Sequence, residues 1–213
     1  HIFIYLVGDI AFVPLEVLLV VIVLERLLHS HEKQAVLDKL NMVIGAFFSE
    51  LGTRLLGELT EADAAREETT RRLAPGADWG PREFAAALQY ARSFTPKLDP
   101  TTLDLVDLRN LLAGKREFLV RLLENPNLLE HDRFTDLLWA IFHLGEELTA
   151  RESLKGLPES DVEHLSGDLA RVYSQLATEW VAYAQHLKRD YPFLFSLVLR
   201  THPLQEEPSA VVS

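Results

Sequence analysis

The feature that most constrains the fold is an apolar run from Ile2 to Leu24, in which seventeen of twenty-three residues are Ile, Leu, Val or Phe. A helix of this length reaches about 34 Å, because each residue adds about 1.5 Å. The hydrocarbon core of a bilayer is about 30 Å thick. The run is too long for a signal peptide, and no small-residue cleavage site follows it. The pattern predicts one transmembrane helix over residues 1–28.

Two acids interrupt the apolar run. Asp9 and Glu16 lie seven residues apart, so a helix places both carboxylates on one face. An acid that faces lipid is costly, and the stripe is therefore expected to face another helix, a water-filled space or a cationic partner. Pro14 lies between the acids and predicts a helix kink, because it removes a backbone donor. Asp9 and Glu16 are candidates for an ion pathway or for a polar contact within the membrane.

Charge and composition restrict the partners and the compartment. The 213 residues carry a formal net charge of −11 and include no cysteine. The acidic balance argues against nucleic acid as a partner, and disulfides, thiolate metal sites and cysteine nucleophiles are excluded. Arg26, Lys33 and Lys39 follow the apolar run, and no Lys or Arg precedes it. The positive-inside rule thus predicts a single-pass inner-membrane protein with a cytoplasmic C-terminal domain.

The remainder of the chain has helical periodicity, and no stretch alternates as a strand would. Pro81 predicts the start of a helix that ends near Phe94. A further helix is expected after Thr101, whose side chain would cap it together with Asp104.

Two longer helices are predicted nearer the C-terminus. One extends from about Asp132 to Glu152, and the other opens at Ser160 after Gly156 and Pro158. The second has a regular apolar seam formed by Leu165, Leu169, Val172, Leu176, Trp180, Tyr183 and Leu187. The predicted fold class is all-α, with one N-terminal transmembrane helix that continues into a helical bundle.

Three regions follow from this pattern: the span over residues 1–28, a cytoplasmic helical bundle over 29–203 and a disordered tail over 204–213. Residues 191–199 are almost wholly apolar but too short to cross a bilayer as a helix. We expect protein packing to cover them, with a neighbouring subunit or the membrane interface as alternatives. The chain begins at His1 without a methionine, so further residues are expected upstream.

Histidine and carboxylate clusters supply the candidate metal ligands. His143 and Glu147 are spaced i, i+4, and Asp161, His164 and Asp168 are spaced i, i+3 and i+7. Bundles that hold two metal ions use Glu-x-x-His motifs on facing helices, and the nearest match here is Asp161 with His164. The alternative is that these are surface histidines and salt-bridged carboxylates, so the metal ligands His143, Glu147, Asp161 and His164 stay candidates.

Catalytic motifs are missing from the sequence. No phosphate-binding glycine loop, zinc-protease motif or nucleophile elbow occurs. We therefore assign no catalytic residue, leave the cofactor unknown and predict a protein that is not an enzyme; a Ser/His/Asp triad assembled from distant positions stays an open alternative.

Three segments carry a resemblance to a known family: YLVGDIAFVPLEVLLV near the start, LNMVIGAFFSELG at 40–52 and HLKRDYPFLFSLVLRTHP at 186–203. They resemble an uncharacterised prokaryotic family of single-span membrane proteins with a cytoplasmic helical domain. The resemblance implies a bacterial or archaeal membrane protein and carries over no activity.

These observations lead to three hypotheses. The first is a homo-oligomeric, cation-conducting channel in the membrane lipid, with Asp9 and Glu16 facing its axis. The alternative is a non-enzymatic scaffold or sensor subunit whose acidic stripe pairs with another membrane protein. The third is a membrane-tethered helical bundle that binds a metal.

Overall fold

The computed structural model describes residues 16–26, 39–126, 128, 131–205, 208–209 and 211. The chain divides into two compact units, His1–Leu40 and Asn41–Ser213. In the first unit, residues 16–26 form a helix, and all of its side chains are exposed. Asp9 and Pro14 lie outside the described residues, whereas Glu16 is the first described residue of this helical stretch.

The transmembrane prediction is corrected by the structure. Across the described ranges, no helix combines the length and the apolar character that a membrane crossing requires. The prediction of an all-α protein with an N-terminal transmembrane helix is therefore wrong in its transmembrane part. The inner-membrane localisation, the cation channel and the membrane scaffold depended on that helix and are wrong with it.

The second unit is helical, and no strand occurs among its described residues. Helical residues 41–47 lead into its first bounded element. The bounded elements in chain order are the π-helical turn η1 (Phe48–Gly52), α2 (Thr53–Glu61), α3 (Arg66–Leu73), α4 (Pro81–Ser93), the 3-10 turn η2 (Pro100–Thr102), α5 (Leu105–Gly114), α6 (Arg116–Leu123), α7 (Asp132–Ala150), α8 (Glu159–Asp190) and α9 (Pro192–Thr201).

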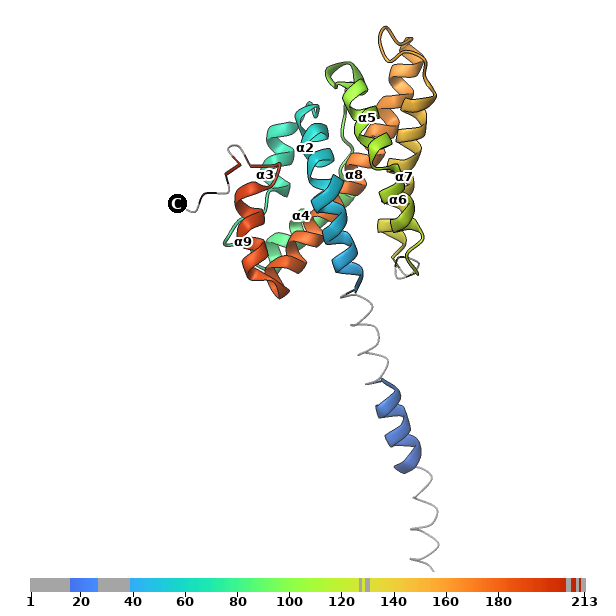
Figure 1. Ribbon diagram of the computed structural model, residues 1–213. Coiled ribbons are helices and arrows are strands. Elements are labelled where there is room, and N and C mark those ends of the chain that lie inside the picture. Colours follow the sequence, from blue (N-terminus) through green and yellow to red (C-terminus); the bar gives the residue numbers. More distant parts are fainter. Residues whose placement is uncertain are drawn as a thin grey trace, which may run out of the picture. The chain divides into compact units, whose positions relative to one another are not determined.

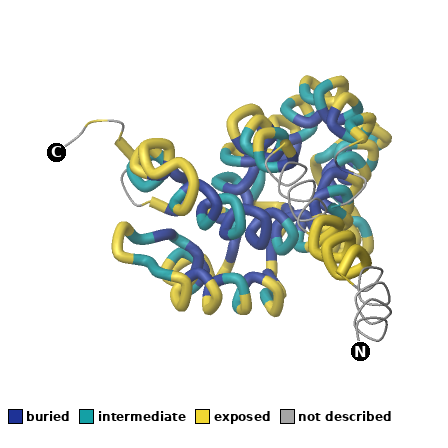
Figure 2. Tube along the Cα trace, turned by 90° about the horizontal axis from the view of Figure 1, so that it is seen from below, coloured by how far each residue is buried: buried dark blue, intermediate teal, exposed yellow. Residues whose placement is uncertain are grey.

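Helix α8 is the central element of this unit (Figure 1). It packs against α4, α7, α9 and α2, and Figure 1 shows it crossing between α5, α6 and α7 on one side and α4 and α9 on the other. The predicted apolar seam is confirmed: six of its seven side chains are buried, and Tyr183 is half-buried. Figure 2 shows the buried stretches facing one another inside an exposed outer layer.

The caps that the sequence predicted are only partly correct. Helix α4 begins at Pro81 as predicted, and the Gly80 amide donates to Glu83 Oε2 at 2.7 Å. Thr101, by contrast, does not cap α5, because it lies within η2 and donates to Asp99 Oδ1. Asp104 caps α5 instead, since its Oδ1 accepts from the amides of Val106 and Asp107.

Because neighbours cover α8 on several sides, polar as well as apolar side chains of this helix are buried. Its buried polar residues are Asp168, Thr178, Glu179 and His186. The C-terminal apolar segment forms α9, where Phe195 is buried but Phe193 is 71% exposed. The expected cover over residues 191–199 is therefore incomplete within this chain.

Candidate metal centre

The candidate site lies where α7 and α8 pack against each other. The two helices are joined by a connection that contains Gly156, whose φ of +66° is in the left-handed region that favours glycine. His143 and Glu147 are one turn apart on α7, and His164 and Asp168 are one turn apart on α8. Pairs spaced i, i+4 share a helix face, so the two pairs can face each other.

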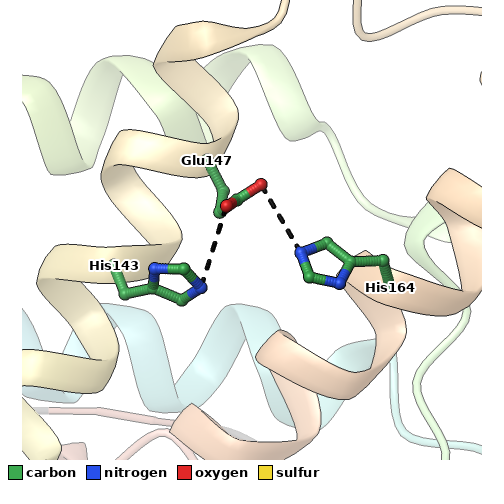
Figure 3. A group of neighbouring side chains, drawn as sticks. All are labelled: His143, Glu147 and His164. Carbon is green, nitrogen blue, oxygen red and sulfur yellow. Dashed lines mark ion pairs between the residues drawn. The ribbon is translucent and has the colours of Figure 1, made fainter.

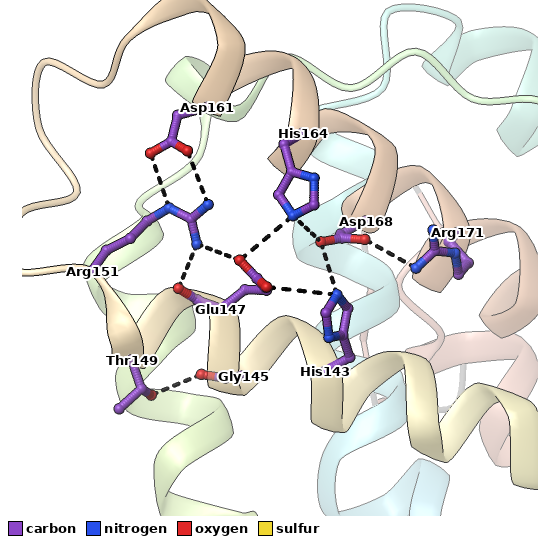
Figure 4. A network of polar contacts seen from close by, with 9 residues as sticks. All are labelled: His143, Gly145, Glu147, Thr149, Arg151, Asp161, His164, Asp168 and Arg171. Carbon is purple, nitrogen blue, oxygen red and sulfur yellow. Dashed lines mark hydrogen bonds and ion pairs between the residues drawn. The ribbon is translucent and has the colours of Figure 1, made fainter.

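Two imidazoles and two carboxylates alternate around the site, which we call the His/carboxylate cluster: His143, Glu147, His164 and Asp168 (Figure 4). Figure 3 shows three of the four, with Glu147 between His143 and His164. Each imidazole Nε2 lies 3.4 Å from Asp168 Oδ2. Toward Glu147, His164 Nε2 lies 3.5 Å from Oε2 and His143 Nε2 lies 3.9 Å from Oε1. The ligand atoms of His143, Glu147 and His164 all lie within 4.8 Å of one another.

The four nitrogen–oxygen separations can be compared with the length of a hydrogen bond and with the distance between two ligands of one ion. An N–H···O hydrogen bond measures about 2.7–3.2 Å, and all four separations exceed that range. Ligands at about 2.0–2.2 Å from a tetrahedral metal are about 3.3–3.6 Å apart. Three of the four separations fall in this range, and the fourth exceeds it by a few tenths of an ångström. Three of these four separations therefore match those between ligands of one tetrahedral ion.

Asp168 forms the buried side of the cluster. Its side chain is only 4% exposed, and Arg171 Nη1 contacts Oδ1 at 3.0 Å. Oδ2 is buried and has no hydrogen-bond partner, although both imidazoles lie near it. A buried carboxylate oxygen without a donor is costly, and a cation at the cluster would remove that cost.

Glu147 is held in place by Arg151, whose Nη1 donates to Glu147 Oε2 at 2.7 Å. This hydrogen bond is the main reason that the pKa of Glu147 is lowered, and the two nearby imidazoles lower it further. The carboxylate is therefore ionised at neutral pH, as a metal ligand must be. Metal-binding carboxylates are commonly oriented by such outer hydrogen bonds, and Arg171 orients Asp168 in the same way.

The structure brings together three of the four predicted ligands. His143, Glu147 and His164 converge, whereas Asp161 turns to Arg151, which contacts its two oxygens at 3.2 Å each (Figure 4). Arg151 lowers the pKa of Asp161 as well. Asp168 takes the place expected for Asp161, because it lies four residues after His164 and one full turn along the same face. The sequence spacing included Asp168 among the nearby acids, but it did not indicate which of Asp161 and Asp168 would face the imidazoles.

The cluster is open to solvent on one side. The side chains of His143 and His164 are 47% and 51% exposed, in contrast to the buried Asp168. An ion could therefore enter without unfolding of the helices, and water could complete its coordination.

The fold and the cluster define a helical domain with histidine and carboxylate groups between its two longest helices. The family model "Uncharacterized protein MJ1433, C-terminal helical domain" matches residues 36–200, and the model of the MJ1433 N-terminal helical domain matches residues 1–28. The uncharacterized protein MJ1433 of Methanocaldococcus jannaschii is 42% identical over 203 residues, which cover 95% of this chain and 81% of that protein. The chain belongs to this MJ1433 family.

No solved structure matches the chain. The predicted resemblance to an uncharacterised prokaryotic family is confirmed by the archaeal relative, but nothing in these comparisons supports its single-span membrane character.

Proposed function

We propose that this protein binds one divalent transition-metal ion at the His/carboxylate cluster. The observation that carries the proposal is the placement of two imidazole Nε2 atoms at 3.4 Å from Asp168 Oδ2, a buried oxygen without a hydrogen-bond donor. Glu147 approaches the same imidazoles from the opposite side at 3.5 and 3.9 Å.

The donor set indicates the class of metal. Two imidazoles with carboxylate oxygens suit Zn²⁺ and similar ions such as Fe²⁺ or Ni²⁺, whereas Ca²⁺ and Mg²⁺ prefer oxygen ligands alone. With neutral imidazoles, Glu147 and Asp168 contribute two negative charges that match one divalent cation. The ion would join α7 to α8, because each helix supplies one imidazole and one carboxylate.

The first experiment measures metal binding directly. Protein freed of metal by a chelator is titrated with Zn²⁺ in a calorimeter, and bound metal is counted by mass spectrometry. We expect one Zn²⁺ per chain, and affinity at least tenfold lower in the H164A and H143A variants, because loss of even an outer-shell partner costs about 10–100-fold. Equal affinity in the wild type and in H143A/H164A would contradict the proposal.

A matched pair of variants separates the ligand from its surroundings. Glu147→Gln removes a ligand charge, whereas Glu146→Gln changes the adjacent residue, which contacts Arg116 outside the cluster. We expect E147Q to weaken Zn²⁺ binding and E146Q to leave it unchanged. Equal weakening in both variants would point to general electrostatic attraction rather than to coordination.

A further inference from the structure

A second polar pocket lies beside α8, lined by residues of α4, α7 and α8 and with a volume of about 220 Å³. Its residues on α7 are Arg133 and Asp136. Asp136 precedes His143 by seven residues, which is about 10 Å along a helix. No residue of the His/carboxylate cluster lines it, so this is a separate site. We call it the Glu179 pocket.

The floor of the Glu179 pocket has two unsatisfied acceptors. Glu179 and Gln175 lie one turn apart on α8, and the side chain of Glu179 is only 2% exposed. Glu179 Oε1 and Gln175 Oε1 are buried without a hydrogen-bond partner. Arg133 places its Nε 3.6 Å from Glu179 Oε1, which is beyond hydrogen-bond distance. Buried acceptors are rarely left without a donor, so the floor favours a ligand with several N–H groups.

The rim of the pocket has the opposite character. Arg92 from α4 and Arg133 from α7 are both exposed, and their guanidinium groups suit a carboxylate, which they can bind through two parallel hydrogen bonds. Ala91 and Phe94 add an apolar wall on the side of α4. Two arginines and two acids, Asp136 and Glu179, line the pocket. Burial raises the pKa of the Glu179 carboxyl, although the nearby His131, Arg133 and Arg92 act in the opposite direction. Groups of both signs face the pocket, so a ligand with both an ammonium and a carboxylate fits it better than a simple ion.

We propose that the Glu179 pocket binds a small zwitterion of the amino-acid class. The ammonium group donates to Glu179 Oε1 and Gln175 Oε1, since an ammonium has three donors and no acceptor. The carboxylate lies between Arg92 and Arg133, and the side chain contacts Ala91 and Phe94. This proposal uses none of the metal ligands and stands independently of metal binding.

The test screens the twenty common L-amino acids against the full chain by ligand-observed NMR. At least one is expected to bind, and its decarboxylated and deaminated counterparts, which keep the same side chain, are expected to bind at least tenfold more weakly by calorimetry. Loss of one charged contact in a buried site has this effect or a larger one. Binding by none of the twenty would overturn the proposal. So would equal binding of the amine or the acid alone.

Variants assign the binding to the pocket. E179Q is expected to abolish binding of the amino acid, and R92Q to weaken it at least tenfold, whereas R82Q should bind as the wild type does. Arg82 lies on the same helix ten residues earlier and is exposed outside the pocket. Circular dichroism and the unfolding temperature report whether each variant is folded. Unchanged binding in folded E179Q and R92Q would contradict the proposed site.

Discussion

His202 shows at the scale of one residue how burial changes the chemistry of a side chain. It is 2% exposed, its ring centre lies 6.0 Å from that of Trp180, and both ring nitrogens lack a hydrogen-bond partner. Burial disfavours the charged form and lowers the pKa of His202 from 6.5 to about 4. The folded protein therefore holds a neutral imidazole through most of the mildly acidic range.

This shift predicts a loss of stability in acid. Between pH 6.5 and about 4 the unfolded chain binds a proton at His202 that the folded chain does not bind, so the free energy of unfolding falls as the pH falls through this window. The expected contribution is about 2 kcal/mol between roughly pH 7.5 and pH 5. Urea unfolding of the wild type and of His202→Leu at both pH values measures it.

The difference between the two proteins isolates His202, because every other titrating group is shared. We expect the variant to lose less stability in acid than the wild type. Parallel loss in both proteins would show that His202 is accessible to protons in the folded state.

A group of buried polar side chains on α2, α3 and α8 differs from His202, because its members have hydrogen-bond partners. Tyr173 donates to Thr60 Oγ1 at 3.0 Å, and Thr69 donates to Asp63 Oδ2 at 2.7 Å. Thr60 in turn donates to the carbonyl of Leu56 at 2.7 Å. A buried group with a partner is stabilising or neutral, whereas an orphaned one is costly. We therefore interpret this group as structural. The Asp168 and Glu179 oxygens differ from His202 as well, because they lie in the His/carboxylate cluster and in the Glu179 pocket, where a ligand can reach them.

At the scale of the element, the start of α5 depends on one side chain. Asp104 Oδ1 accepts from two amides of the first turn, at 3.1 Å from Val106 and 2.9 Å from Asp107. Removal of an N-cap acceptor typically costs about 1 kcal/mol. We expect Asp104→Ala to lower the free energy of unfolding by about that amount, as measured by urea denaturation.

Two comparisons test the assignment of this cap. Asn110→Ala on the exposed face of the same helix should change stability by less than about 0.5 kcal/mol. Thr101→Ala tests the cap that the sequence indicated, and a cost equal to that of Asp104→Ala would restore Thr101 as the residue that starts the helix.

At the scale of the whole molecule, the proposed ion joins the two helices around which the second unit is built. Any ligand that binds only the folded state raises stability, by about 2.7 kcal/mol when its concentration is a hundred times its dissociation constant. For a domain of this size about 1 kcal/mol corresponds to roughly 2–4 °C in the unfolding temperature. Saturating Zn²⁺ should therefore raise the unfolding temperature by about 5–10 °C.

Differential scanning calorimetry with Zn²⁺ and with a chelator measures this shift. The H143A/H164A variant should unfold at the same temperature in both conditions. A shift of equal size in the variant would place the ion elsewhere on this acidic protein. The predicted homo-oligomer stays a prediction at this scale.

The sequence by itself determined the helical class, the extent of the longest helices and the apolar seam of α8. Helical spacing and the breaks at Pro81, Gly156 and Pro158 are local properties, and they match the bounds of α4, α7 and α8 to within a few residues. Local spacing also identified His143, Glu147 and His164 as candidates. The apolar run near the N-terminus led to a wrong prediction. Its hydropathy indicated a membrane span, but no helix among the described residues is long and apolar enough to be one.

The tertiary structure alone decided which charges meet. Asp161 and Asp168 both lie near His164 along α8, and only the position of Arg151 on the connection after α7 assigns Asp161 to the arginine and leaves Asp168 facing the imidazoles. Asp104 replaced Thr101 as a cap because a short 3-10 turn precedes α5. In the same way, Glu179 and Arg133 are forty-six positions apart in the chain and meet only when α7 packs on α8. Packing between helices determines which charged residues contact one another, and a local sequence pattern does not contain that information.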